Sequence, residues 1–195
     1  FAYNYVDMKN ICLSTDSDEY IKDAKEKWSP LFLKRSKELS NDKALAIDVW
    51  KNALSHLQNI GQEYEFSMYI EPSSPIRNIE WVRENIIKFI NSNDDLWMSI
   101  KETDTKFRLE KQFMIDNKCN ILNIFNNSEE NSLRQKSKVT YHKDGVFYIA
   151  KNKYIFETNL LFSGYVKGVI NKFQSINIDK LEELEYARYL IEKDL

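Results

Sequence analysis

Apolar residues recur at helical spacing in four segments of the chain. The clearest is 42–59, where one stripe is formed by Ile47, Trp50, Leu54 and Leu57, and Gly61 follows where a helix cap is expected. In the 75–91 segment, Ser74 and Pro75 are typical of a helix N-cap and first turn. Helices are therefore predicted over 18–28, 42–59, 75–91 and 178–193.

Alternation of apolar and polar residues predicts strands between these helices. It is cleanest at 63–70, where every second residue is apolar, and Pro72 ends the run. Further strands are expected within 2–13 and over 96–102 and 106–115, whereas 118–126 fits either a strand or a helix. The polar segment 126–134 is the best internal boundary of the chain.

The stretch from Lys138 to Phe173 contains the strongest hairpin pattern. Asp144-Gly145 favours a type I′ turn between strands 139–142 and 146–149. A weaker turn at Asn152-Lys153 precedes a third strand at 154–158, and a helix is expected over 160–174. The predicted fold class is α+β: an antiparallel sheet with a C-terminal three-stranded meander, packed by four or five helices.

Size and composition favour one globular domain, 1–195, which the 126–134 loop would divide into an N-terminal lobe (1–126) and a basic meander with helices (134–195). With 195 residues, 43% hydrophobic, the chain can bury a core without disulfides. No apolar run approaches the ~20 residues of a membrane span, and no signal-peptide pattern is present. Cys12 and Cys119 are expected to be reduced thiols in a cytoplasmic protein.

Charge is distributed unevenly, although the net charge of the whole chain is only −2. Residues 134–173 carry eight basic and two acidic side chains, with tyrosines between them. Lysines gain affinity for phosphates through counterion release, and aromatic rings stack on bases. The alternative is that the lysines only keep exposed strands soluble. The candidate nucleic-acid-binding residues are Lys136, Lys138, Lys143, Lys151, Lys153, Lys167, Lys172, Tyr148 and Tyr154.

The same stretch contains an acidic pair, Asp144 and Glu157, followed by Asn159. This spacing resembles the core of the PD-(D/E)xK nucleases, in which two carboxylates hold Mg²⁺ and a third residue positions the attacking water. The usual lysine is replaced by Asn159, and a turn already accounts for Asp144. The resemblance implies a catalytic site of Asp144, Glu157 and Asn159, with Mg²⁺ as cofactor under this hypothesis alone.

A second resemblance rests on the run VFYIAKNKYIFE followed by LLFSGYVKGVINKF. It is similar to the C-terminal pattern of the DUF4868 proteins, which include the DNA-binding subunit of the bacterial Kiwa anti-phage system. This resemblance implies a non-enzymatic DNA-binding component that acts with a membrane partner. Outside the nuclease hypothesis no cofactor is expected.

The first functional hypothesis is therefore a non-enzymatic protein of bacterial or phage conflict that binds DNA, RNA or another acidic partner. A divergent Mg²⁺-dependent nuclease and a protein–protein interaction module or inhibitor are the alternatives. No phosphate-binding glycine loop or nucleophile motif is present.

Overall fold

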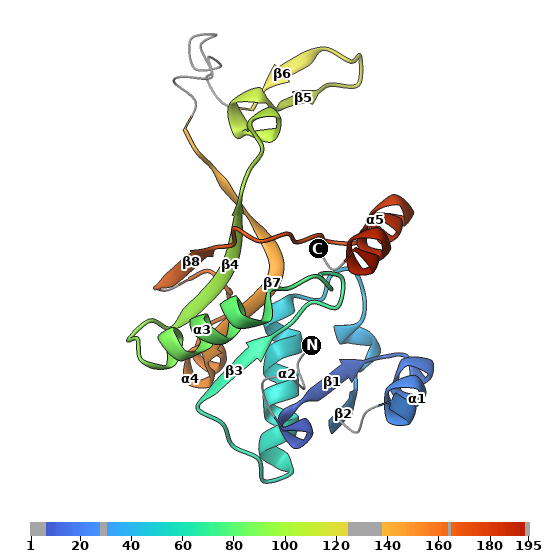
Figure 1. Cartoon of the computed structure of the whole chain (residues 1–195), viewed down its shortest axis with the longest axis vertical. Coiled ribbons are helices and arrows are strands. Elements are labelled where there is room, and N and C mark those ends of the chain that lie inside the picture. The colour runs from blue at the N-terminus through green and yellow to red at the C-terminus, as the bar shows by residue number, and fades with distance from the viewer. Residues whose placement is uncertain (1–6, 28–30, 125–137, 164, 194–195) are drawn as a thin grey trace.

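The computed structural model describes residues 7–27, 31–124, 138–163 and 165–193 (Figure 1). Its largest sheet has four strands in the order β3-β7-β4-β8. These strands are β3 (Phe66–Tyr69), β7 (Tyr141–Lys151), β4 (Leu96–Glu102) and β8 (Val166–Ile170). Because β7 is antiparallel to both β3 and β4, and β4 is parallel to β8, three of the four strands share one direction.

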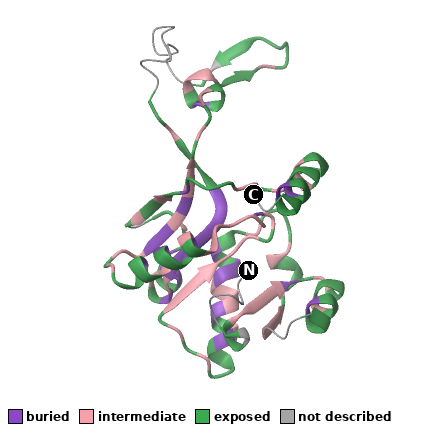
Figure 2. Ribbon diagram, in the orientation of Figure 1, coloured by how far each residue is buried: buried purple, intermediate pink, exposed green. Residues whose placement is uncertain are grey.

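Helices cover both faces of this sheet. On one face α2 (Ala46–Asn59) places Ile47, Trp50 and Leu54 against Tyr148 and Ala150 of β7. On the other face α3 (Ile79–Ile90) contributes its buried residues to a cluster that contains alternate residues of β7, and that cluster consists of Val82, Phe89, Trp97, Val146, Phe147 and Ile149. The side chains of β7 thus pack into hydrophobic clusters on both faces of the sheet, which explains why its central residues are all buried (Figure 2).

Two strand–helix–strand units give the fold its parallel character. β3, α3 and β4 form one unit, in which β7 lies between the two parallel strands. The other unit joins β1 (Cys12–Thr15), α1 (Asp18–Lys27) and β2 (Leu31–Lys34), and its strands pair in parallel. Parallel neighbours need such crossovers because a short turn cannot reverse the chain twice. The architecture is therefore mixed α/β, and the predicted α+β antiparallel sheet is wrong.

The predicted meander fails at Asp144-Gly145. β7 continues through this dipeptide, and its register against β4 shifts between Met98 and Ile100, which marks a bulge. Gly145 has the positive φ of 70° that a hairpin turn would require, but the bulge uses it instead. Asp144-Gly145 therefore has the backbone conformation expected of a turn, but it forms a bulge within one continuous strand.

The two elements after β7 also differ from the prediction. The expected strand 154–158 is helix α4 (Asn152–Glu157), which starts where the Asn152 side chain donates to the Tyr64 carbonyl at 2.7 Å. The expected helix 160–174 contains strand β8. Gly168 lies so close to β4 that an added Cβ would stand 2.5 Å from Ile100 Cδ1, so a glycine suits this strand contact.

Other predicted elements are confirmed, with shifted ends. The helices are found as α1, α2, α3 and α5 (Leu181–Glu192), and 63–70 and 96–102 contain β3 and β4. The stripe of α2 is buried as expected, and Gly61 follows its C-cap with φ 76°. The N-cap of α3 is Asn78, whose side chain accepts a hydrogen bond from the Trp81 amide at 2.8 Å, rather than Ser74.

Residues 105–124 form an arm that projects from the sheet (Figure 1). The predicted strand 106–115 is largely two 3₁₀ turns, and only its end forms β5 (Phe113–Ile115), which pairs with β6 (Ile121–Asn123). The boundary predicted at 126–134 lies outside the described residues, and so does Lys136. Within the described ranges, no helix has the length and apolar character needed to cross a membrane.

Candidate functional site

The carboxyl ends of three strands converge on one region of the molecule. β1 ends at Thr15, β2 at Lys34 and β3 at Tyr69, and the β1 and β3 arrows point the same way in Figure 1. The Arg35 charge lowers the pKa of the Tyr69 hydroxyl, so the end of β2 lies near the end of β3. Open α/β sheets bind ligands beyond the carboxyl ends of their strands, so this region is the candidate site.

The loop after β3 is fixed tightly against β7. Arg77 donates from Nε to the Val146 carbonyl at 3.0 Å and from Nη2 to the Glu71 carbonyl at 2.5 Å. Ser74 is completely buried, and its Oγ lies 3.1 Å from both the Asp144 carbonyl oxygen and Asn177 Oδ1. These bonds hold residues 71–77 in one conformation against the bulge of β7.

The Asp144 carboxylate stabilises the bulge through hydrogen bonds. One oxygen accepts a hydrogen bond from the Ser99 hydroxyl and another from the Val146 amide at 3.2 Å. The second oxygen accepts from Asn171 Nδ2 at 2.7 Å. Since this carboxylate is buried and fully hydrogen-bonded, its role in the fold is structural.

Gly145 brings the β7 backbone against the loop after β3. A Cβ on this residue would lie 2.4 Å from Ser74 Oγ and 2.6 Å from Glu71 Oε2. The Glu71 carboxylate therefore occupies the space that a side chain at 145 would fill. A glycine is required here both by this contact and by its positive φ.

Two tyrosines form a wall beside Glu71. Burial raises the pKa of the Tyr148 hydroxyl, and the Glu71 charge and a hydrogen bond to that carboxylate raise it further. Burial also raises the pKa of Tyr69, Glu71 adds to the increase, and Arg35 opposes it. The two rings meet edge to face with centroids 6.0 Å apart. Both hydroxyls therefore stay protonated and can donate hydrogen bonds.

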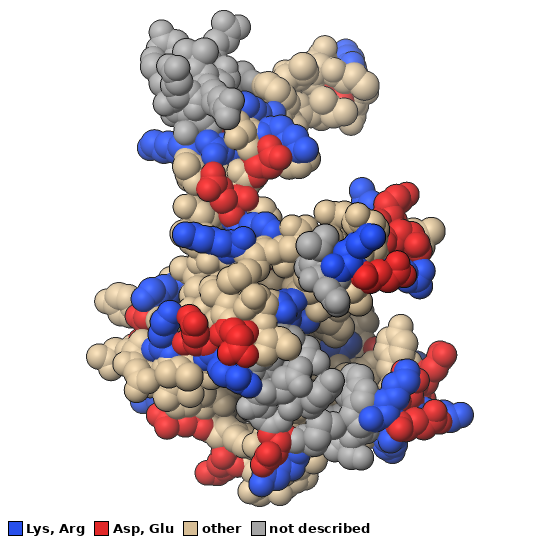
Figure 3. All heavy atoms as spheres, in the orientation of Figure 1, with Lys and Arg blue, Asp and Glu red and all other residues tan. Residues whose placement is uncertain are grey.

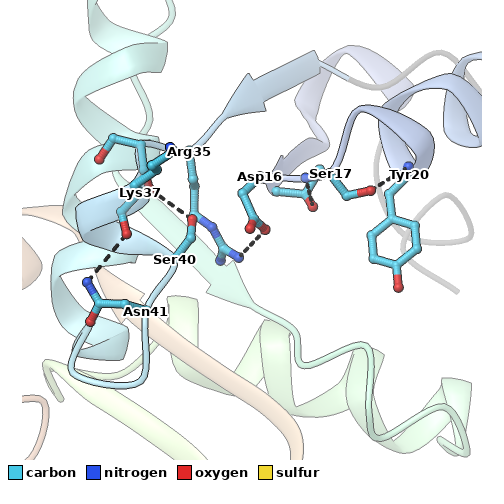
Figure 4. A network of polar contacts seen from close by, with 9 residues as sticks. Asp16, Ser17, Tyr20, Arg35, Lys37, Ser40 and Asn41 are labelled. Atoms are coloured by element: carbon cyan, nitrogen blue, oxygen red, sulfur yellow. Dashed lines mark hydrogen bonds and ion pairs between the residues drawn. The ribbon is translucent and has the colours of Figure 1, made fainter.

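Arg35 supplies the positive charge of the site. Its guanidinium lies 3.6 Å from the Asp16 carboxylate, which belongs to the turn after β1, and its backbone amide donates to the Thr15 carbonyl at 2.9 Å (Figure 4). The side chain is 23% exposed, so it is held in place yet accessible. A guanidinium in this position suits a phosphate or carboxylate group, which it can bind through two parallel hydrogen bonds.

These groups define what the site can recognise. Arg35 favours an anion, Glu71 accepts hydrogen bonds, and Tyr69 offers a hydroxyl donor, while the buried Tyr148 is hydrogen-bonded to Glu71. Among the residues that the structure describes, no three His, Cys, Asp or Glu side chains come together to hold a metal ion. The charges and hydrogen-bonding groups of the site therefore suit a polar, anionic ligand.

The residues predicted as a nuclease centre lie in different surroundings. Asp144 is buried in the bulge, whereas Glu157 is exposed at the end of α4 and lies 3.8 Å from Lys153. Asn159 Oδ1 accepts a hydrogen bond from Lys51 at 3.4 Å. No described contact joins Asp144 to Glu157 or Asn159.

The described candidate nucleic-acid-binding residues are scattered, and several have structural partners. Lys151 donates to the Asn93 carbonyl at 2.8 Å, and Lys167 lies over the Trp97 ring, 4.5 Å from its centroid. Tyr148 is buried in the core, and the Tyr154 hydroxyl donates to the Leu161 carbonyl. Lys138, Lys143, Lys153 and Lys172 are exposed. Basic and acidic side chains are interspersed on the face seen in Figure 3.

The sequence interpretation missed Arg35, Glu71 and Arg77 as site residues. Residues 31–40, which include Arg35, show no clear periodicity. Residues 72–75, which lie between Glu71 and Arg77, are predicted only as the end of a strand and the start of a helix. The order strand, loop, helix, strand from 63 to 102 was an available indication of a parallel unit, whose loop would lie at a ligand-binding strand end.

Comparisons with known proteins give a consistent result. No protein-family model matches the chain. The pseudaminic acid cytidylyltransferase of Campylobacter jejuni is 25% identical over 181 residues, which are 92% of this chain and 77% of that enzyme. The N-acylneuraminate cytidylyltransferase of Escherichia coli is 26% identical over 92% of this chain and 41% of its own length. A solved structure of CMP:2-keto-3-deoxy-manno-octonic acid synthetase, complexed with CTP, superimposes with a TM-score of 0.65 at 9% identity, covering 95% of this chain and 82% of that one.

These findings overturn both family resemblances drawn from residues 138–173. The similar proteins are cytidylyltransferases along nearly the whole chain, not DUF4868 proteins or PD-(D/E)xK nucleases. The non-enzymatic DNA-binding hypothesis, its anti-phage setting and the nuclease alternative are wrong. The α/β fold is that of the sugar-nucleotide synthetase.

Proposed function

We propose that this chain is a cytidylyltransferase that joins a cytidylyl group to an acidic sugar. In this reaction a sugar hydroxyl attacks the α-phosphorus of CTP, a new P–O bond forms, and pyrophosphate leaves. The observation that carries the proposal is the sequence similarity to two cytidylyltransferases over 92% of the chain, each of which is named for an acidic sugar.

The candidate site supports the proposal from its chemistry. Arg35 offers a guanidinium to a phosphate group, and Asp16 restricts its orientation at 3.6 Å. Glu71 provides an acceptor and the partly buried Tyr69 a hydroxyl donor for sugar or base groups, while the buried Tyr148 is hydrogen-bonded to Glu71. Gly145 leaves room for the Glu71 carboxylate beside the β7 backbone, and this contact sets the position of Glu71 in the site.

A divalent cation commonly accompanies nucleoside triphosphates, which supply some of its oxygen ligands. A cation that is bound with CTP would take its ligands from the phosphates, from water and from any protein oxygen nearby. The sequence-based expectation of no resident cofactor and of a cytoplasmic location both remain predictions.

The test is a substrate matrix with the 195-residue chain. CTP, UTP, ATP and dTTP are each combined with pseudaminic acid, N-acetylneuraminic acid or neutral N-acetylmannosamine, and pyrophosphate release is measured with Mg²⁺ present. The proposal predicts release only with CTP and only with an acidic sugar. Release that is independent of the sugar, or equal with all four nucleotides, would contradict it.

A further inference from the structure

Residues 171–179, which we call the strap, join β8 to α5 without forming a helix or a strand. In Figure 1 the strap leaves β8, passes the end of β4 and crosses the sheet toward α5. Asn171 is buried, whereas the rest of the strap is exposed or partly exposed. A segment with so little buried surface depends on its hydrogen bonds to keep one conformation.

The first part of the strap is anchored to the sheet. The Asn171 amide donates to the Ile100 carbonyl at 2.7 Å, and Asn171 Nδ2 donates to the Asp144 carboxylate at 2.7 Å. The Phe173 ring lies against Trp81, with centroids 6.1 Å apart. The strap therefore starts from a fixed position on β4 and β7.

The far end of the strap is bonded to the loop after β3. The Ile178 amide donates to the Ser73 carbonyl at 2.8 Å, and Asn177 Oδ1 lies 3.1 Å from the Oγ of buried Ser74. The Ser74 amide in turn donates to the Glu71 carbonyl at 3.1 Å, so Glu71 belongs to the same turn. The strap thus contacts the turn that presents Glu71 to the candidate site.

Lys101 of β4 binds the strap between these two ends. Its ammonium donates to the Phe173 carbonyl at 3.1 Å and to the Ser175 hydroxyl at 3.2 Å. An ammonium carries three donors, and hydrogen bonds from a charged donor are stronger than neutral ones. One side chain therefore fixes two positions of the strap, between its anchor at Asn171 and its contact with the loop after β3 at Asn177.

We propose that Lys101 is a positioning residue of the candidate site, which acts through the strap on the turn that carries Glu71. This role rests on the proposed function, and it assigns Glu71 to the sugar side of that site. Arg35 is held by Asp16 and Thr15, which lie outside the strap, so phosphate binding should not depend on Lys101. A loosened strap should weaken sugar binding equally in the ground state and the transition state, which raises KM and leaves kcat unchanged.

Hydrogen exchange of the whole chain, followed residue by residue by NMR, tests the structural step. Lys101→Met removes the ammonium and keeps a side chain of similar length. The Ile178 amide, which donates to Ser73, is expected to exchange about tenfold faster, because a loosened strap opens more often. Lys101→Arg keeps the charge and the donors, and it should restore the wild-type rate. Lys88→Met, which removes an exposed lysine of α3 paired with Glu84, is the matched control.

Steady-state kinetics of the reaction between CTP and an acidic sugar test the functional step. Lys101→Met is expected to raise the KM for the sugar about fivefold and to leave kcat and the KM for CTP within about twofold. Lys101→Arg should return the sugar KM to the wild-type value. A purely stabilising role of Lys101 would instead lower the melting temperature and the amount of active protein, so kcat would fall while both KM values stayed constant.

An unchanged exchange rate of the Ile178 amide in Lys101→Met would overturn the structural step. In an active chain, faster exchange without a change in the sugar KM would overturn the functional step, and so would a fall in kcat alone. If the wild-type chain forms no product with any acidic sugar, the proposed function fails and the functional step falls with it. The Ile178 exchange rate would still decide whether Lys101 holds the strap.

Discussion

Arg35 and Glu71 place opposite charges just after the carboxyl ends of β2 and β3, whereas the Asp144 carboxylate is buried in the bulge of β7. The first two have groups available to a ligand, and the third has used its carboxylate in three hydrogen bonds. Single substitutions should therefore separate ligand binding from stability.

Arg35→Ala should weaken CTP binding with little loss of stability. A charge-assisted hydrogen bond contributes about 1.5–3 kcal/mol, so the dissociation constant should rise about tenfold or more. Titration calorimetry measures this change. Arg188→Ala, which removes an exposed arginine paired with Glu185 on α5, is the matched control and should leave CTP affinity unchanged. Equal affinities of all three proteins would exclude Arg35 from the site.

Asp144→Ala should destabilise the fold by about 2–4 kcal/mol, because it leaves buried donors on Ser99, Asn171 and Val146 without an acceptor. Glu157→Ala, at an exposed ion pair, should stay within about 0.5 kcal/mol of wild type. Urea denaturation compares the two. A large loss of stability in Glu157→Ala, or none in Asp144→Ala, would be inconsistent with the positions described for these carboxylates.

The buried Tyr148 hydroxyl should make stability depend on alkaline pH. An unperturbed tyrosine has a pKa of 10.0, and burial with the Glu71 charge raises the pKa of Tyr148 in the fold. Above pH 10 the unfolded chain releases a proton that the folded chain keeps, so the free energy of unfolding falls as pH rises. Tyr148→Phe should show a shallower fall above pH 10 in urea denaturation, and an unchanged slope would contradict the assignment.

At the scale of elements, the bulge of β7 is the feature on which the site depends. It brings the backbone at Gly145 against the loop after β3, and the hydrogen bonds of Arg77 fix that loop. The bulge thus interrupts the β4–β7 ladder, and it also provides the backbone against which Glu71 packs.

Gly145→Ala and Gly61→Ala form a matched pair that measures how closely the β7 backbone at Gly145 packs against the loop after β3. Both glycines have φ near 70°, so either alanine costs about 1–2 kcal/mol in the backbone. A Cβ at 61 meets nothing within 4 Å, whereas one at 145 collides with Ser74 and Glu71. Thermal denaturation should therefore show a larger loss for Gly145→Ala. Similar losses would mean that the contact between β7 and the loop is relaxed.

Elements with a strong local pattern could be predicted, and those decided by tertiary contacts could not. The stripe of Ile47, Trp50, Leu54 and Leu57 specifies α2 because one apolar face is enough to define a helix. β8 could not be recognised because five residues are too few to show a period of their own, and its pairing with β4 depends on a glycine contact with Ile100. Asp144-Gly145 has the same chemistry in a turn and in a bulge, so only the partner strand distinguishes them.

At the scale of the whole molecule, the candidate site combines segments that are far apart in the sequence. Arg35 follows β2, Glu71 follows β3 and Tyr148 lies within β7, and no motif joins them. In the described part of the basic stretch 134–173, lysines pair with Asp94, Asp95 and Glu157 or are exposed. A compositional bias therefore could not locate the site, and only the fold could.

Direct identification of the product is the measurement that tests the central claim. The chain is incubated with CTP, Mg²⁺ and pseudaminic or N-acetylneuraminic acid, and the mixture is analysed by phosphorus NMR and mass spectrometry. A new CMP–sugar phosphodiester, formed in equal amount with pyrophosphate and formed more slowly by Arg35→Ala at limiting CTP, is the predicted result. CTP bound by the wild-type chain but left intact, or cleaved without attachment to the sugar, would contradict the account.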